Sequence, residues 1–168
     1  AAMPCLSIEQ LKHLEQVTCE TEVPLAVRWA AAVACLLAHV CLRFSDAQRS
    51  EGICTNGVSI FDFTWRSKSK RSGFPWAALC KGWSGAPWAE TLIALLSSNS
   101  WIGDFVIPAF QQDQVSIKRQ PASYAQVVAL VRRALMPTEH AHRRVYANYS
   151  SRLSPIAPDL ELAARHLH

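Results

Sequence analysis

The sequence predicts a mainly helical α+β domain, in which a helical core carries a small antiparallel sheet or β-hairpin. Several segments show helical spacing of apolar residues, and two of them follow a serine that can cap a helix. A run of β-branched and aromatic residues at 58–65 precedes a polar turn that ends in glycine. Of the 168 residues, 50% are apolar and 18% are charged, which permits a sizeable core and excludes a wholly disordered chain.

Start and stop signals bound the predicted helices. Ser7 and Gln10 have the spacing of a capping box. Pro24 suits the first turn of a helix rich in alanine and leucine, which we expect to be buried on most sides. Ser123 caps a further helix, which Pro137 ends. The predicted helices span residues 8–18, 25–42, 88–96 and 124–135, and others begin near Thr138–Glu139 and Pro158–Asp159.

The predicted sheet is a hairpin. Residues 58–65 form its first strand, 67–73 its basic turn and 74–76 its return strand. Pro75 confines the return strand to an edge, because proline has no N–H to donate to a neighbouring strand. Residues 101–110 are predicted to be irregular, with Pro108 ending any strand there.

The net charge of +4 is unevenly distributed along the chain. The first 22 residues hold four glutamates and one lysine, a net charge of −3, and are interpreted as an acidic helix or leader. Residues 23–168 carry the other 16 basic and 9 acidic residues, a net charge of +7, and are predicted to form one domain. A total of +4 alone does not identify a nucleic-acid binder, but the basic residues are clustered.

The cysteines and the apolar runs bear on the cellular compartment. None of the six cysteines forms a CxxC pair, so we expect free thiols in a reducing compartment. The amino-terminal residues lack the basic start and apolar stretch of a signal peptide. The longest uncharged apolar run, 29–38, has 10 residues, whereas a membrane span needs about 20. We therefore expect an intracellular protein, nuclear or cytoplasmic, that is neither secreted nor membrane-bound.

The first candidate for chemistry is Arg43, at the end of the predicted buried helix. An arginine that emerges from an apolar helix is costly unless an anionic group meets it, and Asp46 is placed to orient its guanidinium. The alternative is a local Arg–Asp pair that ends the helix, with Ser45 or Asp46 capping the next one.

Two further basic clusters could meet phosphates. The predicted hairpin turn holds four cations in six residues, and its alternative interpretation is a solvated turn. His140 and Arg143 are three residues apart at a predicted helix start, so they share a face and could converge on one phosphate. A basic surface turn is the alternative there. The cations of the hairpin turn are Arg66, Lys68, Lys70 and Arg71.

The remaining histidines and aromatic residues are assigned simpler roles. Two His-x-His pairs, at 140–142 and 166–168, invite a metal hypothesis, but residues two apart on a helix do not face each other, so no metal site is predicted. His39 is interpreted as a core histidine. Trp76, Trp83 and Trp88 are interpreted as packing residues rather than platforms for nucleic-acid bases.

Taken in order along the chain, four short motifs resemble the conserved boxes of the catalytic domain of the tyrosine recombinase (phage integrase) family, including the enzymes of eukaryotic mobile elements. Leu42-Arg43-Phe44-Ser45-Asp46 resembles the first arginine box, and Lys68 on a hairpin 25 residues later resembles the catalytic lysine. Residues 138–143 resemble the H-x-x-R box, and 164–168 resemble the segment that supplies the last histidine. The resemblance covers about residues 24–168.

The resemblance implies a mechanism without metal or cofactor. Arg43 and Arg143 would hold the non-bridging oxygens of a DNA phosphate, and Lys68 would protonate the leaving 5′-oxygen. His140 would handle the proton of the nucleophile, and His168 would hydrogen-bond the phosphate. Lys70 replaces Lys68 if the register is shifted by two, and His166 remains an alternative to His168. Further contacts to double-stranded DNA would come from Arg66, Lys70, Arg71 and Arg144.

One departure from the family pattern concerns the nucleophile. The family's tyrosine follows the last box, so we expect it to lie beyond His168, and we expect residues 1–168 to be inactive alone. Tyr146 and Tyr149 come too early in the sequence to match it, and the family's separate amino-terminal DNA-clamping domain has no counterpart here. The resemblance implies self-association on DNA. The alternatives are an inactive DNA-binding remnant of a mobile element and a helical interaction domain.

Overall fold

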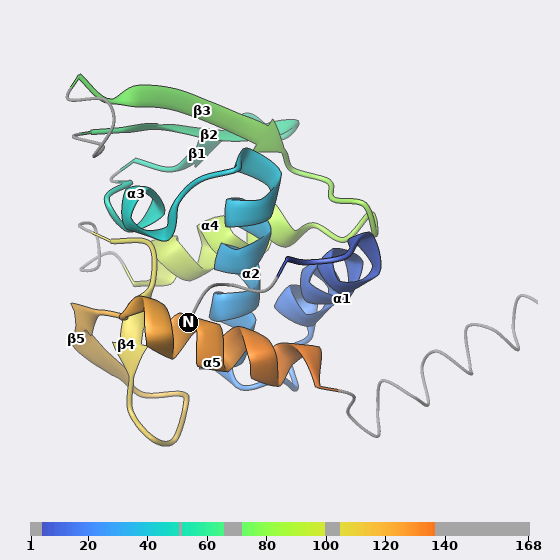
Figure 1. Cartoon of the computed structure of the whole chain (residues 1–168), viewed down its shortest axis with the longest axis vertical. Helices are drawn as coiled ribbons and strands as arrows, with labels where there is room; N and C mark the ends of the chain where they lie inside the picture. The colour runs from blue at the N-terminus through green and yellow to red at the C-terminus, as the bar shows by residue number, and fades with distance from the viewer. Residues whose placement is uncertain (1–4, 51, 66–71, 100–104, 137–168) are drawn as a thin grey trace, which may run out of the picture. The chain divides into compact units, whose positions relative to one another are not determined.

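The computed structural model describes residues 5–50, 52–65, 72–99 and 105–136, which form five helices and five strands in these ranges (Figure 1). Their order is α1 (Ile8–Cys19), α2 (Leu25–Val40), α3 (Phe44–Gln48), β1 (Cys54–Thr55), β2 (Ser59–Thr64), β3 (Phe74–Leu79), α4 (Trp88–Ser98), β4 (Pro108–Phe110), β5 (Ile117–Pro121) and α5 (Tyr124–Leu135). Contacts divide the chain into two units, residues 1–135 and 136–168, and all these elements lie in the first. The predicted α+β class is confirmed.

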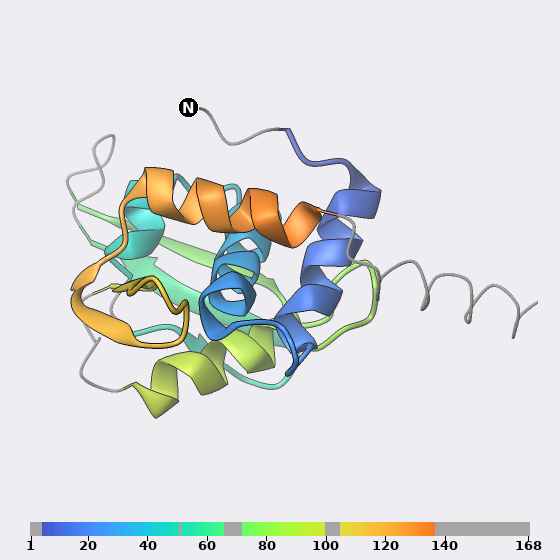
Figure 2. The same ribbon diagram turned by 90° about the horizontal axis from the view of Figure 1, so that it is seen from below.

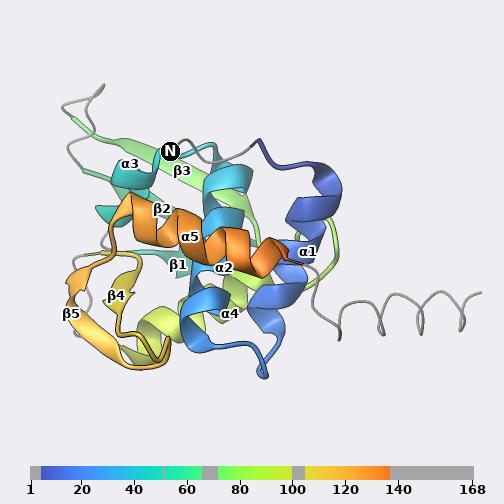
Figure 3. The same cartoon turned by 60° about the horizontal axis from the view of Figure 1, so that its bottom comes forward.

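Helix α2 is the centre of the core. Ten of its 16 residues are buried, and Figures 2 and 3 show α1, α4 and α5 arranged around it. The small alanine side chains let these neighbours approach closely, while Trp29 fills the space toward β4. The Trp29 Nε1–H donates to the Val106 carbonyl at 2.9 Å, so this buried polar group is satisfied. Helix α2 is therefore packed against other elements on most of its sides, as its alanine- and leucine-rich composition predicts.

The larger sheet has three antiparallel strands in the order β1-β2-β3. Strands β2 and β3 pair from Ser59↔Leu79 to Thr64↔Phe74, which confirms the predicted hairpin. Pro75 lies in β3, an edge strand of this sheet, also as predicted. The turn residues 66–71 lie outside the described part of the chain.

The predicted helices are largely confirmed. The capping box of α1 is present, with the Ser7 Oγ accepting from the Gln10 amide at 3.1 Å and the Gln10 Oε1 accepting from the Ser7 amide. Ser123 and Gln126 form the same reciprocal pair at α5. Helix α1, in the segment interpreted as a leader, packs into the same core as α2. The helices predicted near Thr138 and Pro158 lie outside the described residues.

The prediction for residues 101–110 is wrong at its carboxyl end. Pro108 does not end a strand but begins β4, which pairs with β5 in a second, two-stranded sheet. Pro108 is opposite Pro121, the last residue of β5, with an irregular register between Pro108 and Phe110. Proline has no N–H to donate to a neighbouring strand. At the end of a short strand that pairs on one side only, this loss costs little, because no further strand is there that would accept the hydrogen bond.

A side-chain amide fixes this second sheet to α3. The Gln48 Oε1 accepts from the amides of Val106 and Ile107 at 2.9 and 3.1 Å. Its Nε2 donates to the carbonyls of Ile107 and Ala122 at 3.1 and 3.0 Å. One side chain thus satisfies four backbone groups in a region where Val106 and Ile107 are fully buried.

We predict that Gln48→Ala destabilises the protein by about 2–4 kcal/mol, because it leaves buried backbone donors and acceptors unpaired. Urea unfolding followed by circular dichroism measures this loss. Gln112→Ala is the matched control: Gln112 is exposed in the β4–β5 connection, and its loss should change stability by less than about 0.5 kcal/mol. Equal stability of the two variants would contradict the role of Gln48.

Candidate functional site

Arg43 lies in the short link between α2 and α3. Cys41 adopts the left-handed conformation (φ 57°) that ends α2, and Leu42 is buried against the core. Arg43 then has extended backbone as the N-cap of α3, and its carbonyl accepts from the amides of Asp46 and Ala47, both at 3.0 Å. Its side chain is exposed. The guanidinium is therefore hydrated, and the argument that it requires an anion to compensate burial does not hold.

The proposed pairing of Arg43 with Asp46 is not observed. Among the described residues, no ion pair joins the two side chains. Asp46 is only 4% exposed, and its Oδ1 has no hydrogen-bond partner within the described part of the chain. The local Arg–Asp pair that was the alternative interpretation is therefore absent there, and the Arg43 guanidinium is available to an external anion.

A largely apolar pocket of about 710 Å³ adjoins Arg43. The end of α2, the start of α3, the residues before α1 and the start of α5 all contribute to it. The rings of Phe44 and Tyr124 lie 5.5 Å apart at one side. Arg43 is the charged residue among those that line the pocket, so an anion bound there would lie beside an apolar surface.

Helix α3 connects Arg43 to the end of the hairpin strand β2. Ser50, just after α3, forms an isolated antiparallel bridge with Thr64, and their hydroxyl oxygens are 3.5 Å apart. Thr64 is buried and accepts from the Trp76 indole N–H at 3.0 Å. The segment that begins with the first arginine box is thus joined to strand β2 through Ser50, the second residue after α3.

The other predicted site residues lie outside the described part of the chain. They belong to the hairpin turn and to the segment after α5. These residues are Arg66, Lys68, Lys70, Arg71, His140, Arg143, Arg144, His166 and His168. Arg43 is the predicted site residue whose surroundings are described.

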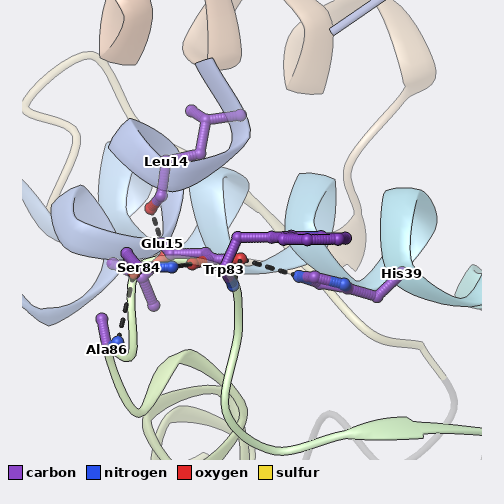
Figure 4. A network of polar contacts seen from close by, with 7 residues as sticks. Leu14, Glu15, His39, Trp83, Ser84 and Ala86 are labelled. Atoms are coloured by element: carbon purple, nitrogen blue, oxygen red, sulfur yellow. Dashed lines mark hydrogen bonds and ion pairs between the residues drawn. The ribbon is translucent and has the colours of Figure 1, made fainter. Parts of the chain in front are cut away.

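Sequence analysis missed a buried polar cluster around Glu15, shown in Figure 4. Glu15 is fully buried on α1, and its carboxylate accepts from the Ser84 hydroxyl at 2.6 Å, the Ser84 amide at 2.8 Å and the Trp83 amide at 3.1 Å. The fourth partner is His39 Nε2, at 2.8 Å. The spacing of Leu11, Leu14, Glu15 and Thr18 places the acid on the apolar face of its helix, and this signal was available in the sequence.

The surroundings of Glu15 refine the interpretation of His39. The imidazole is only partly buried and stacks on Trp88, with ring centroids 5.1 Å apart. Trp88 and Trp76 are buried packing residues, as predicted, but Trp83 is 64% exposed. His39 thus hydrogen-bonds Glu15 at the border of the core and is not enclosed by the core.

The Glu15 cluster stabilises the fold. The Ser84 hydroxyl donates to Glu15 and accepts from the Ala86 amide at 3.1 Å, so it acts as both a hydrogen-bond donor and an acceptor. Gly82 lies so close that a Cβ there would overlap the Glu15 carboxylate. Burial raises the pKa of Glu15, but the hydrogen bonds from Ser84, His39 and Trp83 together outweigh it, so its pKa is lowered from 4.5.

The described residues contain no group of three or more histidine, cysteine, aspartate or glutamate side chains placed to hold a metal ion. None of their helices is long and apolar enough to cross a membrane. All six cysteines are free thiols.

Comparison with known proteins yields no match: no family model fits the chain, and no curated protein or solved structure is significantly similar to it.

We predict that Glu15→Gln lowers the free energy of unfolding at pH 7 by about 2–4 kcal/mol, because the neutral amide cannot accept from all four donors. Since the pKa of Glu15 is lowered by folding, its stabilising effect is present above pH 4.5 and is lost as the pH falls below it. Urea unfolding between pH 7 and pH 3 should therefore show the difference between the two proteins shrinking below pH 4.5.

Glu9→Gln is the matched control for this prediction. Glu9 lies on the same helix, is 82% exposed and pairs with Lys12 at the surface, so its loss should have little effect on stability. A difference between wild type and Glu15→Gln that stays constant down to pH 3 would exclude the ionised carboxylate as its source.

Proposed function

We propose that the protein cleaves and rejoins DNA strands by phosphoryl transfer through a 3′-phosphotyrosyl intermediate, in the manner of tyrosine recombinases. The observation that carries this proposal is the exposed guanidinium of Arg43, which α3 and the Ser50–Thr64 bridge link to the strand leading into the basic turn. The segment that carries Arg43 therefore contacts strand β2, which precedes the turn with Lys68 in the sequence. The nucleophilic tyrosine would be contributed from beyond residue 168.

Arg43 suits the recognition of a phosphate. Its planar guanidinium can donate two parallel hydrogen bonds to the non-bridging oxygens, and it retains its charge at any physiological pH. No ion pair among the described residues occupies it, so none of these pairs must break when the phosphate binds. Negative charge on these oxygens increases as the phosphorus becomes pentacoordinate, so this interaction strengthens in the transition state.

The other groups act on the attacking and leaving oxygens. The tyrosine oxygen forms a bond to phosphorus while the bond from phosphorus to the 5′-oxygen breaks. Lys68 protonates that leaving oxygen, and His140 accepts the tyrosine proton. Arg143 and His168 add donors to the phosphate. The phosphotyrosyl bond preserves the energy of the phosphodiester, so a 5′-hydroxyl can reverse the reaction without a metal or cofactor.

The sharpest test uses the gene product extended past residue 168 through its next tyrosine. On a nicked duplex, where the short fragment with the freed 5′-hydroxyl diffuses away, this protein should form a covalent adduct detectable by denaturing gel electrophoresis. Arg43→Ala and Arg43→Lys should both reduce the rate of adduct formation by about 100-fold or more, because lysine keeps the charge but not the bidentate geometry.

Binding of duplex DNA provides the control for these variants. Arg43→Lys should keep an affinity within about threefold of wild type at fixed salt, because it still neutralises one phosphate. Formation of adduct by Arg43→Lys at the wild-type rate would refute bidentate recognition by Arg43. Salt-dependent binding without any adduct from the extended protein would instead favour the inactive DNA-binding remnant.

A further inference from the structure

The three-stranded sheet presents an apolar face away from the core. Residues opposite one another in antiparallel strands share a face, and the registers Phe61↔Ala77 and Phe63↔Pro75 place these side chains together. Figure 1 shows the described helices on the other side of the sheet, where Ile60 and Trp76 are buried. The outward residues of β2 and β3 are Ser59, Phe61, Phe63, Pro75, Ala77 and Leu79, and Trp65, just after β2, contacts the ring of Phe63.

This face departs from the usual alternation of a half-exposed sheet. A solvent-facing side normally carries polar residues, whereas Phe61 is 39% exposed, Trp65 is 56% exposed and Leu79 is 65% exposed. Ser59, opposite Leu79, is the polar residue of β2 on this face. The other two polar residues of β2 are on the inner face: Thr64 is buried, and the Asp62 carboxylate accepts from the Gly52 amide at 3.1 Å. Within the described strands, no acidic side chain lies at an outward position.

The aromatic residues are spaced along β2 like a stacking platform. Side chains two residues apart on a strand lie about 6.8 Å apart. Stacked DNA advances about 3.4 Å per nucleotide in each strand, so neighbouring bases would have to separate before each could stack on one ring. The Phe63 and Trp65 rings do not keep this spacing, because they contact each other with centroids 4.5 Å apart. The separately exposed rings of the row are therefore those of Phe61 and Trp65, four residues apart. The spacing thus favours an unpaired, extended strand over a duplex.

The charge of the surrounding sequence favours nucleic acid over an apolar protein partner. The six residues between Trp65 and Ser72 carry four cations and no acid, and they connect the two strands of this face. Lys81, two residues after β3, is exposed. An aromatic surface whose two strands are connected in the sequence by a cationic segment fits a single strand, which binds through stacking of its bases and attraction of its phosphates to positive charge.

We propose that the outward face of β2 and β3 binds unpaired bases of DNA, with Phe61 and Trp65 stacking on them. This inference rests on the proposed function, in that it takes DNA as the substrate, and it adds a site for the bases to the site for the phosphate. Stacking tolerates any base, so the face confers little sequence preference. It holds a strand whose bases have separated near the cleaved phosphate.

The test compares the binding of a labelled oligo(dT) 20-mer with that of an abasic 20-mer of equal charge, by fluorescence anisotropy with the 168-residue chain. Wild type should bind the oligo(dT) at least tenfold more tightly than the abasic strand. Phe61→Ala and Trp65→Ala should each weaken oligo(dT) binding by about tenfold and leave abasic binding unchanged.

Two further variants control for folding and for general apolar contact. Trp83→Ala removes a tryptophan of similar exposure, 64%, in the link between β3 and α4, and should bind both strands as wild type does. Trp65→Leu keeps an apolar side chain without the indole ring and should behave like Trp65→Ala. Thermal unfolding verifies that all variants remain folded.

Several outcomes would overturn this inference. Stacking on this face would be refuted if the wild type bound oligo(dT) and the abasic strand with equal affinity. It would also be refuted if Trp65→Leu bound oligo(dT) as tightly as the wild type does, or if Trp83→Ala lost as much oligo(dT) affinity as Trp65→Ala. Self-association that Phe61→Ala abolishes, without any effect on DNA, would identify a protein interface. If the stacking test fails while Arg43-dependent cleavage is observed, only the role of this face is refuted. If the face binds bases but no cleavage is observed, only the recombinase activity is refuted.

Discussion

The burial of α2 is the constraint on which the rest of the described structure depends. A helix with ten buried residues needs neighbours on all sides, and α1, α4, α5 and the inward face of the sheet provide them. The same burial determines where the first basic residue after the helix can lie. The left-handed turn at Cys41 leaves Leu42 in the core and releases Arg43 into solvent. The exposure of the candidate phosphate-binding group is therefore a consequence of core packing.

Glu15 shows how a charge is accommodated inside this packing. A buried carboxylate is costly, but here four donors from α2 and from the link between β3 and α4 satisfy it. Gly82 is required beside it because any side chain would occupy the space of the carboxylate. The cluster thereby fixes the path of the chain from the sheet to α4. The acidic first segment of the sequence thus contributes this buried acid to the fold in addition to the core residues Leu11, Leu14 and Val17.

Elements with local signals could be predicted, whereas contacts between distant residues could not. Serine caps, the composition of α2 and the run that forms β2 act within a few residues, so the helices and the hairpin follow from the sequence. The four hydrogen bonds of Gln48 join residues 58 to 74 positions apart, and no local pattern announces them. Pro108 was misread because a rule for strand interiors does not apply at a strand end. For the site, sequence reasoning located Arg43 but assumed a buried charge that the left-handed turn avoids.

The register of β2 determines both surfaces proposed to act on DNA. A shift of one residue would turn the aromatic row inward and expose the polar one. Apolar burial alone would favour that shift, since it would bury Phe61, Phe63 and Trp65. The bonds of Thr64 with Trp76 and Ser50, and of Asp62 with Gly52, oppose it because they need the polar side chains on the inner face. The Ser50–Thr64 contact also ties the segment after α3, which follows Arg43, to the end of β2. A fold that uses buried polar groups to keep its aromatic residues exposed is explained if those residues bind a partner.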